Sequence, residues 1–207
     1  LANMSAGTVE EFAWMAETLS VDGIAGLEVN VSCPNVESEG MAFGVDPKVV
    51  EQVTKAVRKV TDKPVIVKLS PNVTDIVEIA KAVEAGGGNG VSLINTLLGM
   101  AIDIHRRKPL LGNIYGGLSG PAVKPVALRM VHQVYKGVTI PIMGLGGIMT
   151  GTDAIEFMMA GAQAVQVGTA TMVDPTAISR IAREMGDYVE RYNLNSITDI
   201  IGAVHQS

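Results

Sequence analysis

The sequence of 207 residues is poor in the features that mark several common classes of protein. It holds one cysteine, Cys33, so it cannot form an internal disulfide or supply a cysteine-ligated metal or iron–sulfur site within this chain. Positive charge is scarce: 16 Lys and Arg stand against 21 Asp and Glu, which leaves no basic stripe for nucleic acid. No apolar run is long enough to span a membrane, and we expect neither a secretory leader nor a membrane contact. The cytoplasm is the expected compartment.

What is present indicates a globular protein. Hydrophobic residues make up 47% and charged residues 18%, which is typical of a folded α/β protein and not of a disordered chain. The length predicts a single domain over residues 1–207 with a sizeable core. Residues 1–4 resemble the end of a strand and no methionine precedes them, so we expect a fragment of a longer polypeptide.

Apolar runs and turn residues alternate along the chain in a regular order. We expect a strand end at 1–4, strands at 26–32, 64–69, 90–95, 140–144 and 164–168, and helices at 8–19, 47–61, 74–85, 122–135, 150–160, 175–192 and 196–204. Residues 96–120 are expected to form a long polar connection. Strands separated by helices at this spacing predict right-handed βαβ units and a parallel sheet.

The faces of the strands favour a barrel. Between residues 27 and 32, the apolar side chains fall on one face, whereas Glu28, Asn30 and Ser32 fall on the other. A strand in a doubly wound sheet is usually apolar on both faces, although that fold remains an alternative. Polar residues near the carboxyl ends are typical of the mouth of a (β/α)₈ TIM barrel. Since such a barrel needs about 250 residues, we expect an incomplete one, with the last five to six strand–helix units.

A polar cluster follows the second expected strand. Cys33 stands between Asn30 and Asn35, where a strand ends and a loop begins. Amide side chains donate and accept hydrogen bonds, so two of them suit a planar ligand with carbonyl and N–H groups. A thiol there can take or give a proton. Asn95 and Thr96 add an amide and a hydroxyl at the end of another strand. Together they predict chemistry on a small polar ring.

Glycines end the last two expected strands. Gly146 and Gly147 follow one, and Gly168 and Thr169 follow the next. Barrels often bind phosphate with backbone N–H groups of the loops after strands 7 and 8. Each motif alone is better explained as a tight turn. Two of them at matching positions favour a phosphate site.

Lys68 lies in an otherwise apolar strand, on the face that Glu28 and Asn30 share. A lone lysine is usually a solvated surface charge. Here it suits stabilisation of negative charge on a reduced cofactor ring or formation of a Schiff base. For Glu28 we prefer an inward ion pair with Lys68. The histidines show no metal-ligand spacing, so no metal site is expected.

Six segments, in this order, resemble the catalytic subunit of class 1 dihydroorotate dehydrogenase: residues 30–35, 67–69, 94–96, 116–125, 146–149 and 166–169. Cys33 is similar to class 1, because the membrane-associated class 2 enzymes carry serine there. The segment 117–122 resembles the NAD-linked class 1B more than the fumarate-using class 1A. The sequence at 86–89 is richer in glycine than the family pattern. The family's amino-terminal part, with a further lysine and an Asn-rich loop, is not in this chain.

The resemblance implies a role for each matching residue. Cys33 is the base that removes the C5 proton of dihydroorotate while a hydride passes from C6 to FMN. The pyrimidine is held by Asn30, Asn35, Asn95 and Thr96. FMN is held by Asn3, Asn30, Lys68, Ile94, Gly120, Gly146, Gly147, Gly168 and Thr169. The resemblance also implies an electron-transfer subunit with FAD and an iron–sulfur cluster, and a homodimeric core.

Three other functions remain open at this point. A dihydropyrimidine dehydrogenase-like flavin barrel would act on uracil-type rings. A flavin-free barrel aldolase would use Lys68 as a Schiff-base amine. A phosphate-binding module without catalysis would not need Cys33. Flavin absorbance of the pure protein distinguishes the flavin barrel from the flavin-free aldolase.

Overall fold

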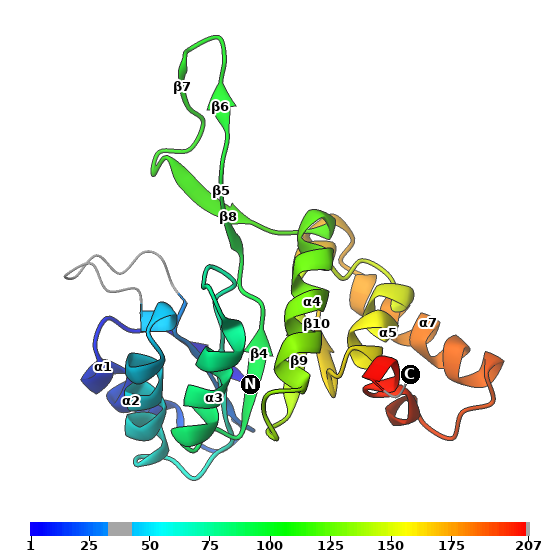
Figure 1. Ribbon diagram of the computed structural model, residues 1–207, viewed down its shortest axis with the longest axis horizontal. Coiled ribbons are helices and arrows are strands. Elements are labelled where there is room, and N and C mark those ends of the chain that lie inside the picture. Colours follow the sequence, from blue (N-terminus) through cyan, green and yellow to red (C-terminus); the bar gives the residue numbers. More distant parts are fainter. Residues whose placement is uncertain (33–42, 206–207) are drawn as a thin grey trace.

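A six-stranded parallel sheet forms the centre of the computed structural model, which describes residues 1–32 and 43–205 (Figure 1). Its strands lie side by side in the order in which they occur along the chain. They are β1 (Ala2–Met4), β2 (Leu27–Asn30), β3 (Val65–Lys68), β4 (Gly90–Leu93), β9 (Ile142–Leu145) and β10 (Ala164–Gln166). All five pairings are parallel, which confirms the expected βαβ organisation.

Helices connect the strands, and most begin at residues suited to start a helix. They are α1 (Val9–Leu19), α2 (Pro47–Arg58), α3 (Ile76–Ala85), α4 (Lys124–Tyr135), α5 (Gly151–Met159), α6 (Thr169–Val173) and α7 (Ala177–Arg191). Thr8, Asp46, Asp75 and Thr150 each accept a hydrogen bond from the first turn of the helix that follows. Pro47 adds a favourable first helical residue after Asp46.

The C-terminal segment differs from the expectation in detail. In place of one helix over 196–204, it contains two short 3₁₀ turns, η3 (Ile197–Ile200) and η4 (Ala203–His205). Gly202, with φ of 70°, interrupts the segment between them. Two further 3₁₀ turns, η1 (Phe43–Val45) and η2 (Pro121–Val123), precede α2 and α4.

The two faces of the sheet differ in polarity. Val29, Val67 and Val91 stand at one level of the sheet, are fully buried and pack with the helices in the main core. Glu28 and Lys68 point to the opposite face, as strand alternation requires. Consecutive helices contact one another, with α1 against α2, α2 against α3 and α3 against α4. The helices therefore form a layer over the apolar face and leave the polar face inside.

The sheet is curled. Gln166 Nε2 on β10 donates to Glu28 Oε1 on β2 over 2.8 Å, although three strands separate β2 from β10. In a flat sheet these strands would lie roughly 19 Å apart at the usual spacing, which is more than two such side chains span. The structure is therefore a parallel α/β fold whose sheet bends around its polar face.

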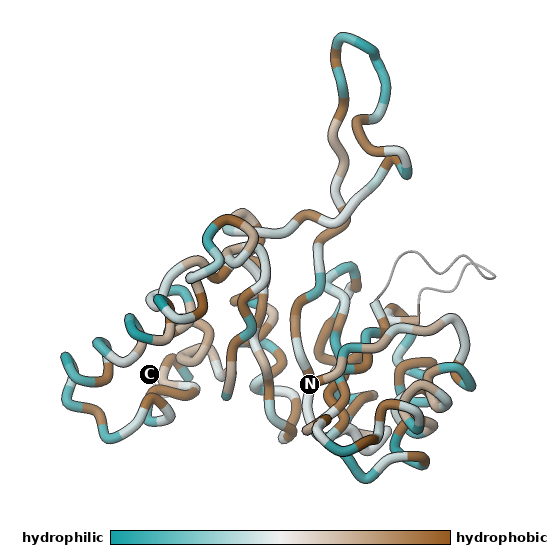
Figure 2. The backbone as a smooth tube through the Cα atoms, turned by 180° about the vertical axis from the view of Figure 1, so that it is seen from behind, coloured by the Kyte–Doolittle hydropathy of each residue, from teal (hydrophilic) through white to brown (hydrophobic). Residues whose placement is uncertain are grey.

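The expectation of a polar connection over residues 96–120 is wrong. Strand β5 (Leu97–Met100) pairs antiparallel with β8 (Tyr115–Leu118), and β6 (Ile102–Asp103) pairs with β7 (Lys108–Pro109). This arm projects away from the sheet (Figure 1). Figure 2 shows hydrophobic segments along it. Ile102 and Ile104, which belong to the arm, are largely exposed. Its apolar runs are too short and too interrupted by Gly and charged residues to be distinguished from a loop in the sequence.

Candidate active site

Polar side chains from three neighbouring strands lie at one level near the carboxyl ends. Asn30 on β2 pairs with Lys68 on β3, and Lys68 pairs with Ser92 on β4. Residues in register on parallel strands point to the same side of the sheet. The polar face of the curled sheet therefore carries an amide, an amine and a hydroxyl in a row.

Two amides and a hydroxyl form a connected cluster above this row. Asn95 Nδ2 donates to Asn30 Oδ1 over 3.2 Å and also to Ser32 Oγ. Ser32 donates to the same Asn30 oxygen through its hydroxyl, at 2.9 Å, and through its backbone N–H, at 3.2 Å. The N–H of Thr96 donates to Asn95 Oδ1 over 2.8 Å. Three of the four residues assigned to the pyrimidine thus lie together. Asn35, the fourth, and Cys33 lie outside the described residues.

Glu28 is buried, with 5% of its surface exposed, and its hydrogen-bond donors among the described residues are all neutral. Its carboxylate accepts hydrogen bonds from Asn3 Nδ2 at 2.5 Å, from Ser92 Oγ at 2.7 Å and from Gln166 Nε2 at 2.8 Å. Burial by itself raises the pKa of this carboxyl, but the three hydrogen bonds and the charge of Lys68 outweigh burial and hold the pKa below its usual value. Glu28 is therefore ionised at neutral pH.

The expected ion pair between Glu28 and Lys68 is wrong. No salt bridge joins these two described residues, because Glu28 stands opposite Ile66, two residues before Lys68 along β3. The carboxylate is already satisfied by its three neutral donors. The side chain of the half-buried Lys68 makes no hydrogen bond to any part of the chain that the structure describes. Its ammonium group is thus available to a ligand.

Three glycine-containing loops meet at the carboxyl ends of β9 and β10. A Cβ placed on Gly147 would lie 2.7 Å from the carbonyl oxygen of Gly120, and one on Gly120 would lie 3.4 Å from Thr169 Cγ2. Thr169 Oγ1 also donates to Ser119 Oγ over 2.9 Å. Within residues 1–32 and 43–205, the N–H groups of Gly147, Gly168 and Thr169 donate to no other group of the protein. Close backbone approach with unpaired N–H groups is what an anion site requires.

Positive φ angles explain why glycine stands in two of these loops. Gly120, Gly146 and Gly147 have φ of 85°, 125° and 80°, a region that other residues enter only at a cost. Ile94, the remaining residue assigned to the flavin, is 2% exposed and lies against Gly146, where an added Cβ would come within 3.2 Å of Ile94 Cγ1.

Lys124 supports the loop after β9 from outside. Its ammonium donates to Asp153 at 2.6 Å and to Glu156 at 2.7 Å, and these hydrogen bonds raise its pKa. Asp153 also accepts hydrogen bonds of 2.9 Å from the backbone N–H groups of Met149 and Thr150. Lys124 therefore forms its ion pairs with α5, and its ammonium group is not available to bind an anion at the glycine loops.

Sequence reasoning assigned no role to four residues of this region: Ser32, Ser92, Lys124 and Gln166. Strand alternation was a signal for Ser92, which shares the inward face with Lys68. Gln166 and Glu28 are 138 positions apart, so no local sequence pattern could predict their contact.

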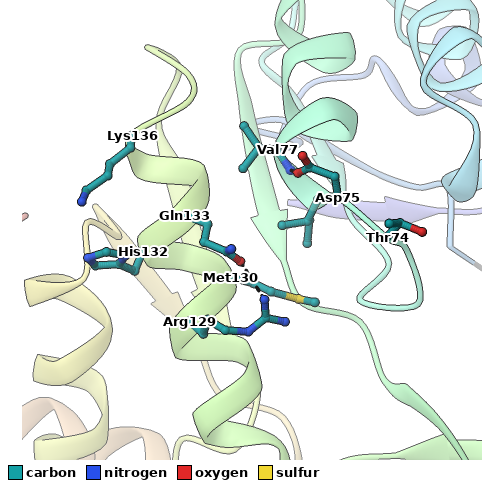
Figure 3. Close-up of a pocket in the computed structure, with 9 residues that line it drawn as sticks. Thr74, Asp75, Val77, Arg129, Met130, His132, Gln133 and Lys136 are labelled. Carbon is teal, nitrogen blue, oxygen red and sulfur yellow. Dashed lines mark hydrogen bonds between the residues drawn. The ribbon is translucent and has the colours of Figure 1, made fainter.

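A pocket of about 470 Å³ lies elsewhere, between α4 and the start of α3 (Figure 3). Asp75, Arg129 and Lys136 are among its lining residues. None of the residues predicted from the sequence to bind cofactor or substrate lines it. In the described part of the chain, no group of three or more His, Cys, Asp or Glu residues is arranged to hold a metal ion. Likewise, none of the described helices has the length and apolar character needed to cross a bilayer.

A curled parallel α/β sheet with polar groups and glycine loops at its carboxyl ends is compatible with part of an α/β barrel, a fold whose active sites lie at that end of the strands. The family model of dihydroorotate dehydrogenase matches residues 1–189, and the chain belongs to this family of flavin-dependent oxidoreductases of pyrimidine biosynthesis. The resemblance seen in the sequence motifs is thereby confirmed.

Three similar proteins share one description. The chain is 59% identical, over 206 residues, to a protein of Desulforamulus reducens described as dihydroorotate dehydrogenase B (NAD(+)), catalytic subunit. This alignment covers 99% of the chain and 68% of the relative. Proteins of Geobacter metallireducens and Phocaeicola vulgatus with the same description are 58% and 55% identical over 205 residues, with 99% of the chain and 67% and 68% of each relative covered.

Proposed function

We propose that this chain oxidises dihydroorotate to orotate as the catalytic subunit of an NAD-linked, class 1B dihydroorotate dehydrogenase. Family membership and the shared description of its relatives support the reaction. The observation that carries the proposal is the layout of the site. Lys68, whose side chain has no hydrogen-bond partner among the described residues, is in register with Asn30 of the amide cluster, and glycine loops with unpaired N–H groups stand at the carboxyl ends of β9 and β10.

The fold proposed for the whole protein is a (β/α)₈ barrel, of which residues 1–207 form one incomplete flavin-binding domain. Glu28, Ser92 and Gln166 come from the second, fourth and sixth strands of the sheet, and the latter two side chains both donate hydrogen bonds to Glu28. Side chains from alternate strands that meet in one layer are the mark of a TIM-barrel interior. Two further strands between β10 and β1 would complete the barrel.

The residues present fit FMN. The N–H groups of Gly147, Gly168 and Thr169, which have no acceptor among the described residues, are proposed to form a cradle for the phosphate together with Gly120 and Gly146. Lys68, Asn3, Asn30 and Ile94 would hold the ring. When bound, FMN supplies an acceptor for a hydride. The ammonium of Lys68 offsets negative charge that collects at the ring's pyrimidine edge.

The substrate contacts follow the same geometry. Asn30, Asn95 and Thr96, which the hydrogen-bond cluster holds together, are proposed to bind the pyrimidine and its carboxylate with Asn35. Cys33 is proposed to remove the C5 proton. Ser32 would keep the oxygen of Asn30 turned toward itself and thereby fix which amide atoms face the ligand.

The electrons are proposed to leave through a second protein. The relatives are described as a catalytic subunit of an NAD(+) enzyme, which fits a separate electron-transfer subunit with FAD and an iron–sulfur cluster. With Cys33 as its only cysteine, this chain cannot hold such a cluster itself. A homodimer of the chain is the proposed core of the assembly.

Anaerobic reduction of the purified holoenzyme tests the proposal. Dihydroorotate should bleach the bound flavin, while dihydrouracil, which lacks the carboxylate, should not. Bleaching by dihydrouracil would instead assign the chain to the dihydropyrimidine dehydrogenase type. Colourless protein that borohydride traps covalently with a carbonyl substrate at Lys68 would support the aldolase.

A further inference from the structure

The carboxylate of Glu28 decides which way two amides face. An ionised carboxylate only accepts hydrogen bonds, so Asn3 and Gln166 must turn their NH₂ groups toward it. Their carbonyl oxygens consequently point away from Glu28. No donor in the described residues bonds to Asn3 Oδ1 or to Gln166 Oε1, so both oxygens are open acceptors.

These acceptors belong to the inner face that carries Lys68. Asn3 stands opposite Glu28 in the register of β1 and β2, and Gln166 ends β10. The carboxylate that joins them is inaccessible, with 5% of its surface exposed, and thus makes no contact with a ligand of ring size. The open oxygens of the two amides and the ammonium of Lys68 are therefore among the polar groups on this face that remain available to a ligand.

We propose that Glu28 is a positioning residue, which orients Asn3 and Gln166 so that the oxygen of Asn3 accepts a hydrogen bond from the N–H at the pyrimidine edge of the flavin. This inference rests on the proposed function. A flavin ring presents one N–H between two carbonyl groups, so it needs an acceptor for the N–H and a donor for the oxygens. Lys68 supplies the donor, and Glu28 ensures that Asn3 presents the acceptor.

The substitution Glu28→Gln makes a specific prediction. Ser92 and Gln166 share one carboxylate oxygen, whereas Asn3 uses the other alone. The new amide keeps its oxygen toward the two donors and places its NH₂ against Asn3. Asn3 must then flip and turn its own NH₂ toward the ligand. A donor facing a donor loses the hydrogen bond, so FMN should bind at least tenfold more weakly.

A double variant that exchanges the amide and the carboxylate distinguishes a positioning role of Glu28 from a role in stabilising the fold. In N3D/E28Q, the NH₂ of Gln at position 28 donates to one oxygen of Asp at position 3, and the other oxygen is again an open acceptor. N3D alone places two carboxylates side by side and should also weaken FMN binding. Both single variants should therefore be weak, and the double variant should recover to within about threefold of the wild type.

Glu84→Gln is the matched control. Glu84 also accepts several hydrogen bonds, from the N–H and hydroxyl of Thr139 at 2.8 and 2.6 Å, but it lies on α3 in the helical layer. The FMN affinity of the E84Q protein should equal that of the wild type. Equal affinity in E28Q and E84Q, or a double variant no better than E28Q, would overturn the inference.

A flavin-free measurement keeps the inference testable on its own. In nuclear magnetic resonance spectra of flavin-free protein, the side-chain NH₂ signals of Asn3 should shift strongly in E28Q and stay in place in E84Q. Unchanged Asn3 signals in E28Q overturn the inference whether or not flavin binds. Absence of FMN binding by the wild type overturns the proposed function instead. If E28Q does not fold, a folded N3D/E28Q protein without FMN affinity overturns the inference.

Discussion

The loop at Gly147 offers the sharpest test of the phosphate cradle. Its φ of 80° and its contacts with neighbouring loops are separate obstacles to a side chain. An added Cβ would lie 2.7 Å from the carbonyl oxygen of Gly120 and 2.9 Å from the backbone nitrogen of Lys124. Both are backbone atoms that cannot rotate away. Gly147→Ala must therefore push apart the loops after β8 and β9.

Gly23→Ala is the control for backbone strain. Gly23 has nearly the same φ, 88°, but no atom lies within 4 Å of its added Cβ. A left-handed conformation costs a non-glycine residue about 1–2 kcal/mol, which is the loss expected for Gly23→Ala. Gly147→Ala adds the cost of overpacking, about 1–3 kcal/mol. Its expected loss of unfolding free energy is thus about 2–5 kcal/mol.

Two measurements on each variant separate fold from site. Urea unfolding of the flavin-free proteins gives the stability difference, and titration with FMN gives the affinity. Gly23→Ala should bind FMN like the wild type, whereas Gly147→Ala should bind at least tenfold more weakly. The phosphate assignment is refuted if Gly147→Ala retains the wild-type affinity, or if Gly23→Ala loses affinity to the same extent.

Three further predictions concern the polar face. Cys33→Ala should slow anaerobic flavin reduction by about 10²–10⁴-fold with FMN still bound, and the wild-type rate should rise with pH because the thiolate is the form that accepts a proton; near-normal single-turnover reduction would exclude the base role. Lys68→Ala should lower the reduction potential of the bound flavin without releasing it, as measured by dye equilibration; an unchanged potential places the lysine away from the ring. Folding lowers the pKa of Glu28. The ionised carboxylate therefore stabilises the fold above about pH 4.3, the pKa of Glu in an unfolded chain. This stabilisation is lost as the pH falls through the lower pKa of the folded state. The difference in urea stability between wild type and Glu28→Gln should shrink over that range, and a constant difference would contradict the assigned pKa.

The sequence predicts the parts of this structure that depend on local patterns. Alternation of polar and apolar residues placed Glu28, Asn30 and Lys68 on the inner face, and the Asp46–Pro47 pair marked the start of α2. The partners of Glu28 could not be predicted in this way. The sequence shows that its carboxylate points inward, but not that three neutral donors satisfy it in place of the nearby lysine.

The arm and the contacts of Lys124 show the same limit of prediction from local sequence. The arm forms because residues 97–100 find a partner in residues 115–118, and the chain between them gives no turn signal strong enough to predict that pairing. Lys124 sits in a segment that resembles the family, yet its bonds to Asp153 and Glu156 arise only when α4 and α5 pack together. Tertiary contacts decided these features, and local propensity did not.

The contact between Glu28 and Gln166 has a consequence for the order in which the chain folds. Closing a loop of 138 residues costs roughly 4 kcal/mol of chain entropy, whereas a hydrogen bond to a charged group returns about 1.5–3 kcal/mol. The contact cannot precede the strands between its ends, so β3, β4 and β9 must assemble first. The site would then be completed in the last step of sheet formation, and the intermediate before it would expose the ionised Glu28 to water.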